Sequence, residues 1–157
     1  MYLKGVSFGL MSGVITVLGL MMGLVVSTHS KTVVLSGIIV IAISDALSDS
    51  FGMHLSVESE QKYTTREIWV ITLTTLFTKF FAGITFVVPI IFFSLMTGVI
   101  INIIWGFLII ILFSIYLAKK DNSSYYTIVL EHLAIAIFVL AVSYLVGYLI
   151  QLFIGVY

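Results

Sequence analysis

Residues 33–55 read VVLSGIIVIAISDALSDSFGMHL, a stretch that is long and apolar enough to cross a membrane as one helix. Asp45 and Asp49 lie in it four residues apart, so a helix places both carboxylates on one face, about one turn apart. A charged side chain near the bilayer centre costs roughly 2.5–3.5 kcal/mol on insertion scales. Ionisable residues at this depth indicate a functional site in a bundle interior or a water-filled cavity.

The composition of the whole chain is that of an integral membrane protein. Of its 157 residues, 61% are hydrophobic and 9% are charged, with a mean hydropathy of +1.26, whereas a soluble domain carries about 25% charge. The formal net charge is zero, so we expect no nucleic-acid partner. Cysteine is absent, and no Walker loop, dinucleotide fingerprint, HExxH or nucleophile elbow is present. Nothing therefore indicates an enzyme or a bound cofactor.

Five apolar stretches are candidate membrane spans, each of which needs about 20 residues. Polar segments separate most of them, while Pro89 and an SLMTG turn at residues 94–98 divide the apolar residues 68–117 into two. We predict an all-α membrane protein, a five-transmembrane-helix bundle that forms a single domain over residues 1–157. The predicted spans are residues 5–26, 33–55, 68–93, 98–117 and 127–153.

The basic residues are distributed unevenly between the two sides of this bundle. The side that holds Lys31 has no other basic residue, whereas the N-terminal side holds Lys4, Lys62, Arg66, Lys119 and Lys120. The positive-inside rule then predicts a cytoplasmic N-terminus and a C-terminus outside, most simply in the plasma membrane of a prokaryote. A four-span alternative, with residues 68–117 as one broken span, would spoil this asymmetry.

Side chains along the second span could hold a metal ion. Asp45 and Asp49 offer carboxylate oxygens, which suit divalent ions, and Met53 extends their face by one turn. His54 lies beside it, and a thioether or an imidazole shifts preference toward transition metals such as Fe(II). A carboxylate in a low dielectric can also carry a proton, so that metal and proton compete, which is the physical basis of proton antiport. Ser12 of the first span matches the depth of Asp49, and the two could line one cavity.

Lys79 in the third span offers a purely structural alternative. Counted from the expected cytoplasmic ends, Lys79 and Asp45 each lie about eleven residues deep, or roughly 15–18 Å at 1.5 Å per residue. A buried Asp45–Lys79 pair would neutralise both charges without any transport role. It would leave Asp49 without a partner, and Asp49 is therefore the stronger candidate ligand.

Two further features are open to more than one interpretation. The glutamates Glu58, Glu60 and Glu131 near the expected cytoplasmic surface are most simply solvated or dipole-favoured charges, but they could form a mouth that attracts cations. The first span carries small residues at four-residue spacing, which lets another helix backbone approach closely. These glycines indicate simple helix packing first, and the border of a permeation route or a dimer seam second: Gly5, Gly9, Gly13, Gly19 and Gly23.

Three segments resemble the vacuolar iron transporter family. GLMSGVITVLGLMMG, residues 9–23, is similar to that family's first-helix pattern G-x-x-D-G-[IL]-[VI]-T. ALSDSFGMHLSVESE, residues 46–60, resembles its second-helix pattern A-x-S-M-A-x-G-E-Y-x-S-x-x-S-E and matches at Ser48, Gly52, Ser56, Ser59 and Glu60. AGITFVVPIIFF, residues 82–93, is similar to the small-residue run that ends at a proline in the third helix. The resemblance implies five helices, a cytoplasmic N-terminus and a dimeric pore.

The departures from the family patterns fall on residues that would bind metal. The first-helix aspartate of the family is Ser12 here, its second-helix methionine is Asp49, and its glutamate after the glycine is Met53. An acid and a thioether thus remain, but on different positions, and we hypothesise that Asp49 supplies the carboxylate that Ser12 lacks. The long acidic cytoplasmic insertion of the family's eukaryotic members is missing.

Together, the residues and the resemblance predict a transporter of a divalent metal ion, of the iron or manganese type, that exports it from the cytoplasm in exchange for protons. The metal is its substrate, the lipid bilayer its surroundings, and a homodimer its expected assembly. One alternative is a non-transporting membrane subunit or scaffold with a buried Asp–Lys clasp. Another is a transporter of a small organic solute, with Asp45 and Asp49 binding an amine.

Overall fold

The computed structural model of the chain describes residues 2–121 and 123–155, and all its regular elements are helices. They are α1 (Tyr2–Thr28), α2 (Lys31–Ser59), α3 (Thr65–Thr85), α4 (Val87–Phe92), α5 (Leu95–Lys120) and α6 (Tyr125–Ile154). With α3 and α4 counted as one, five of the described helical stretches are long and apolar enough to cross a membrane. The predicted all-α bundle with five membrane spans is confirmed.

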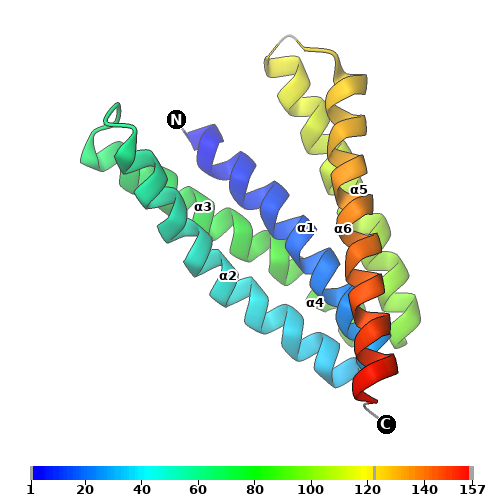
Figure 1. Cartoon of the computed structure of the whole chain (residues 1–157). Coiled ribbons are helices and arrows are strands. Elements are labelled where there is room, and N and C mark those ends of the chain that lie inside the picture. The colour runs from blue at the N-terminus through cyan, green and yellow to red at the C-terminus, as the bar shows by residue number, and fades with distance from the viewer. Residues whose placement is uncertain (1, 122, 156–157) are drawn as a thin grey trace.

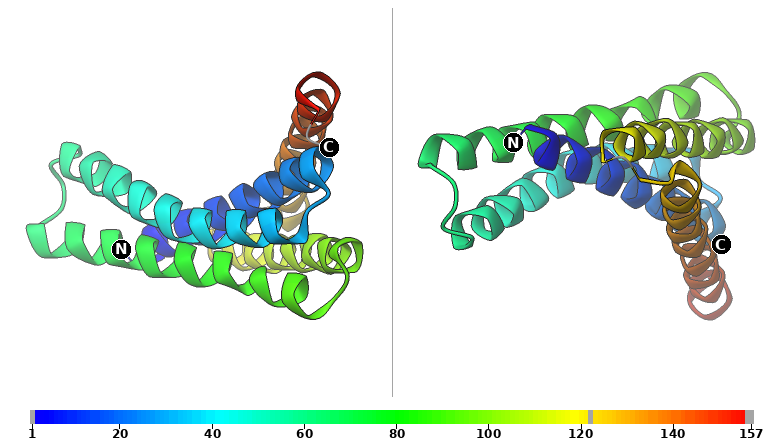
Figure 2. Two further views of the ribbon diagram at one scale, coloured as in Figure 1. Left: turned by 90° about the horizontal axis from the view of Figure 1, so that it is seen from below. Right: turned by 90° about the horizontal axis from the view of Figure 1, so that it is seen from above.

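Helix α1 runs through the middle of the molecule and contacts α2, α3, α5 and α6 (Figure 1). Helices α2 and α3 pack together beside it, α5 contacts α4, and α6 points away from the α2–α3 pair (Figure 2). The start of α1, the α2–α3 loop and the α5–α6 loop lie at one end of the molecule, and the end of α6 lies at the other. The basic residues predicted to share a side are therefore at the same end.

The third span is broken between α3 and α4. Pro89 has no backbone N–H, so the carbonyl of Thr85, four residues earlier, loses its helical donor. Two side chains of α5 are fastened to the break: Asn102 Nδ2 donates to the Phe86 carbonyl at 2.8 Å, and Trp105 Nε1 donates to Thr85 Oγ1 at 3.0 Å. These bonds fix α5 against the third span, with Asn102 buried and Trp105 exposed.

The segment at residues 94–98, expected as a turn, is instead the first turn of α5. Ser94 is the N-cap of this helix, and its hydroxyl accepts a hydrogen bond from the Thr97 N–H at 3.4 Å. The chain reverses one residue earlier, where Lys31 Nζ donates to the carbonyls of Ile91 at 3.0 Å and Phe93 at 2.9 Å. The capping chemistry of serine thus overrode the turn-like appearance of the sequence.

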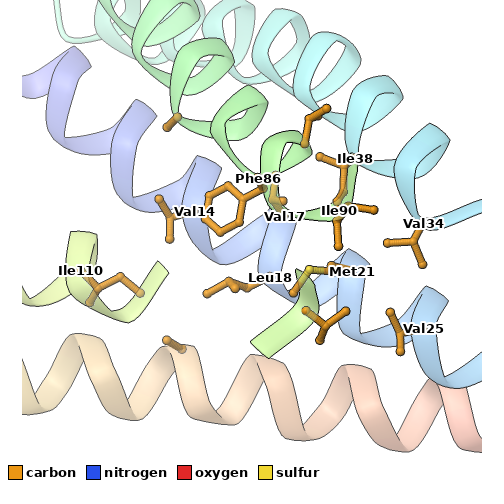
Figure 3. Close-up of a cluster of buried hydrophobic side chains, with 14 residues drawn as sticks. Val14, Val17, Leu18, Met21, Val25, Val34, Ile38, Phe86, Ile90 and Ile110 are labelled. Atoms are coloured by element: carbon orange, nitrogen blue, oxygen red, sulfur yellow. The ribbon is translucent and has the colours of Figure 1, made fainter. Parts of the chain in front are cut away.

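The apolar core lies around the central part of α1. Val14, Leu18 and Met21 of α1 are fully buried or nearly so, and they meet Phe86 beside the α3–α4 break and Ile110 of α5 (Figure 3). A continuous apolar cluster of this kind holds α1 as the central helix. It leaves the polar side chains of α1, α2 and α3 to meet nearer the N-terminal end of α1.

The glycines of α1 are packing surfaces within the chain. A Cβ on Gly9 would lie 2.7 Å from the carbonyl oxygen of Thr75, and a Cβ on Gly13 would lie 3.0 Å from Lys79 Cγ. Farther along, a Cβ on Gly19 would lie 2.9 Å from Val139 Cγ1 of α6. The interpretation as helix packing therefore holds for these positions. Gly9 and Gly13 allow α3 to approach α1 closely, and Gly19 does the same for α6.

Gly9→Ala is expected to destabilise the protein by about 1–3 kcal/mol, because the added methyl meets α3 backbone that must shift. Gly23→Ala in the same helix is the matched control, since a Cβ there would lie 3.5 Å from the Ser143 carbonyl oxygen, an ordinary van der Waals contact. Thermal unfolding of both variants in the same detergent would measure the difference. Equal midpoints for Gly9→Ala and the wild-type protein would contradict the close α1–α3 contact.

Candidate functional site

Lys79 lies at the centre of a polar cluster formed by α1, α2 and α3. Its side chain is 3% exposed, and its Nζ lies 2.6 Å from Asp45 Oδ2 and in an ion pair with Asp49 Oδ2. The same Nζ donates to Ser12 Oγ at 2.8 Å. An ammonium group has three protons to donate, so these three oxygens satisfy it completely.

Ser12 completes the cluster from α1. Its hydroxyl accepts from Lys79 and donates to Asp49 Oδ2 at 2.9 Å. Gly13, the next residue, leaves room for the Lys79 stem to run across α1, because a Cβ there would lie 3.0 Å from Lys79 Cγ. Ser12 and Asp49, predicted to share a depth, are thus in direct contact.

The prediction that Asp49 lacks a partner is wrong. Lys79 bridges both carboxylates, and Asp45 and Asp49 are 22% and 28% exposed while their shared lysine is buried. Counting residues gives the depth of a side chain but not how far it reaches. Since Asp45 and Asp49 lie one turn apart on one helix face, their carboxylates can both reach a single ammonium placed between them.

Met53 and His54 lie in other surroundings. Met53 packs against the apolar cluster of Val57, Ile68 and Ile71. His54 turns toward α3, where its Nδ1 lies 2.9 Å from Thr72 Oγ1 and its ring meets the edge of Trp69 with centroids 4.8 Å apart. Because each helical residue turns by about 100°, a residue five positions from Asp49 points to a different face.

A metal site made of three or more acidic or histidine side chains is not present in the described part of one copy. Across residues 2–121 and 123–155, no group of three or more His, Asp or Glu side chains comes together as a potential metal site. The cluster brings together two carboxylates, one hydroxyl and one ammonium.

The glutamates expected at the cytoplasmic mouth are dispersed. Glu60 is paired with Lys4 and lies 3.9 Å from Lys62, so its charge is already compensated. Glu58 is exposed at the end of α2, and Glu131 is exposed near the start of α6, on the other side of α1. The hydrogen bond from Lys4 holds the pKa of Glu60 below its ordinary value of 4.5.

This lowered pKa predicts a pH dependence. The Lys4–Glu60 pair contributes stability that is fully present above pH 4.5, the ordinary value, and that is lost as pH falls through the lower pKa of the folded state. Thermal midpoints of wild-type protein and Glu60→Gln should therefore converge in acid. Glu58→Gln is the control, and a constant gap between wild-type protein and Glu60→Gln at every pH would contradict the prediction.

Comparison with known proteins bears on the N-terminal part of the chain, which contains most of this cluster. The model of the VIT family matches residues 3–71, which cover α1, α2 and the start of α3. No curated protein and no solved structure matches the chain. The match confirms the resemblance that the two N-terminal helices carry and indicates membrane transport of metal ions in general. With five apolar helices long enough to span a bilayer among its described residues, the chain is an integral membrane protein whose residues 3–71 match the VIT family.

Proposed function

We propose that this protein is a homodimeric transporter of a divalent metal ion of the iron or manganese type, with Asp45, Asp49 and Ser12 as its ligands. The single observation that carries the proposal is the cluster of two partly exposed carboxylates within apolar helices of a chain that matches the VIT family. Carboxylate and hydroxyl oxygens are suitable ligands for such an ion. Two acidic side chains at this depth carry a large insertion cost, and such residues in membrane helices mark ion pathways.

The balance of charge favours a divalent ion between two copies. Asp45 and Asp49 carry two negative charges and Lys79 carries one positive charge, so each copy retains one negative charge. Two copies facing each other retain two, which one divalent cation neutralises. A monovalent ion would leave an uncompensated charge in a low-dielectric site, where such charge is costly.

The outer face of α2 supports the dimer. Ser44, Ser48, Gly52 and Ser56 recur every four residues and are all exposed in a single copy. A Cβ on Gly52 would have no atom within 4 Å, so this small-residue stripe is free to accept another helix. The aspartates flank the stripe by one position, and pairing the stripes of two copies would bring both sets of carboxylates toward one seam.

Gly52→Leu is expected to weaken dimerisation roughly tenfold or more, a loss of about 1.4 kcal/mol, because the leucine side chain would hold the two small-residue stripes apart. Ala141→Leu on the exposed face of α6 is the control, since it adds similar bulk elsewhere on the surface. Single-molecule photobleaching in liposomes would measure the dimer fraction of each. A Gly52→Leu protein that dimerises like wild type would remove α2 from the interface.

The proposed direction is export from the cytoplasm in exchange for protons. It is supported by the five basic residues gathered at the end that holds the N-terminus, which favours a cytoplasmic location of that end in a prokaryotic plasma membrane. Proton exchange follows because a carboxylate can hold either a proton or a metal ion. We infer that the two occupants alternate on the aspartates.

Reconstitution tests the proposal. Proteoliposomes with a trapped metal-sensitive dye should report Mn²⁺ or Fe²⁺ flux, and a second, pH-sensitive dye should report proton movement in the opposite direction. Na⁺ alone should produce neither signal. Absence of flux for every divalent ion, in vesicles that contain folded dimer, would overturn the proposal.

One observation favours a second candidate function, a non-transporting membrane subunit held by a structural clasp. Lys79 is fully satisfied by Asp45, Asp49 and Ser12, an arrangement that stabilises three helices without any ion. In that case the variants of Lys79 should alter stability while no metal flux exists to be lost. The same proteoliposome assay separates the two functions.

A further inference from the structure

Metal binding alone does not account for Lys79. A transporter needs carboxylates, but the chain also places a cation among them, buried and bonded on all three protons. The stem of this lysine passes through space that Gly13 leaves open, so both α1 and α3 accommodate it. The position is therefore built for a lysine in contact with both carboxylates.

The ammonium group uses the oxygens that a metal ion would use. Asp45 Oδ2 lies 2.6 Å from it, and Asp49 Oδ2 accepts from both Lys79 and Ser12. A divalent ion of the iron or manganese type that is held between these two Oδ2 atoms needs the same lone pairs at bonding distance. Both cations cannot lie between these oxygens at once, and a lysine ammonium is a compact charge on a flexible stem that can withdraw.

We propose that the ammonium of Lys79 is a tethered occupant of the ion site, which an incoming divalent ion must displace and which excludes monovalent ions. This inference rests on the proposed function and assigns a selectivity role to a residue on α3, outside the pair of helices that supply the ligands. Lys79 touches the ligands rather than the transported ion. It acts as a competitor for their lone pairs.

Selectivity follows from the tether. A lysine fixed by its backbone competes at an effective concentration on the order of millimolar or higher, without leaving the protein. A monovalent ion brings the same charge as the ammonium and gains nothing by replacing it. A divalent ion brings twice that charge and attracts the carboxylate oxygens more strongly, so it can displace the ammonium where Na⁺ or K⁺ cannot.

Mn²⁺ binding to the purified full-length protein tests the inference. Lys79→Ala is expected to bind Mn²⁺ at least about tenfold more tightly than wild type, since the internal competitor is gone. Added propylammonium should compete with Mn²⁺ in Lys79→Ala, where it can fill the vacated space, and have no effect on wild type. Lys119→Ala, which removes an exposed lysine at the end of α5, should match wild type in both measurements.

Lys79→Arg is the second variant, for use if Lys79→Ala does not fold, because arginine keeps the positive charge. A guanidinium holds carboxylates through two parallel bonds, so Lys79→Arg should bind Mn²⁺ more weakly than wild type. Unchanged or weaker binding in folded Lys79→Ala, or tighter binding in Lys79→Arg, would overturn the inference while leaving the proposed function in place. Absence of Mn²⁺ binding in wild type and in all variants would overturn both.

Discussion

Replacing Asp49 with Asn is expected to reduce metal flux by about 100-fold or more, because loss of a direct ligand exceeds the 10–100-fold effect of an outer-shell partner. The substitution keeps the shape of the side chain but removes its charge. Asp45 and Lys79 then form a neutral pair, and a seam between two such copies has no net charge to attract a divalent ion. Flux of Mn²⁺ into dye-loaded proteoliposomes would measure the loss.

The same substitution should leave the fold intact, because Lys79 retains Asp45 and Ser12 as partners. Asp121→Asn, at the exposed end of α5, is the matched control and should transport like wild type. Undiminished flux in Asp49→Asn would contradict the assignment of this residue as a ligand. Reduced flux in both variants would point instead to a general effect of removing acidic charge.

Replacing Lys79 with Met is expected to cost about 3 kcal/mol of stability, the low end of the range for breaking a buried ion pair, since the aspartates are partly exposed. Methionine fills the space of the lysine stem but leaves Asp45 and Asp49 without a counter-charge in an apolar environment. The free energy of unfolding in mixed micelles would measure the cost. Added Mn²⁺ should restore part of it, because a ligand that binds only the folded state stabilises that state.

Removal of all three charges is the control for this prediction. The triple variant Asp45→Asn/Asp49→Asn/Lys79→Met should regain much of the lost stability, because no unpaired charge remains in the cluster. Asp45→Asn alone should cost less than Lys79→Met, since the lysine is shared and keeps Asp49. If Lys79→Met were as stable as wild type, the lysine would not be the counter-ion of both carboxylates.

The architecture was predictable because hydropathy and charge act along the chain. Apolar length predicted the five spans, and their number predicted which loops share an end. The break in the third span could be expected from Pro89, but its position at Phe86 depends on Asn102 and Trp105 of a distant helix. Similarly, residues 94–98 looked like a turn because capping by Ser94 is a property of the folded helix end.

The sequence predicted which residues form the polar cluster better than it predicted which of them form ion pairs. Depth along each helix correctly suggested that Ser12 lies level with Asp49 and that Lys79 lies level with Asp45. Depth contains no information about rotation, so it did not reveal that His54 faces Thr72 on α3. The signal for the missed Lys79–Asp49 pair was the four-residue spacing of the aspartates, which lets both carboxylates reach one ammonium.

The number of Mn²⁺ ions bound per chain tests the central claim most directly. Equilibrium dialysis of the purified dimer, with bound metal counted by electron paramagnetic resonance, should give about one ion for every two chains, as expected for a site on a two-fold axis. Asp49→Asn should abolish this binding. One ion for every chain, or binding that persists in Asp49→Asn, would contradict a divalent-ion site shared between the carboxylates of two copies.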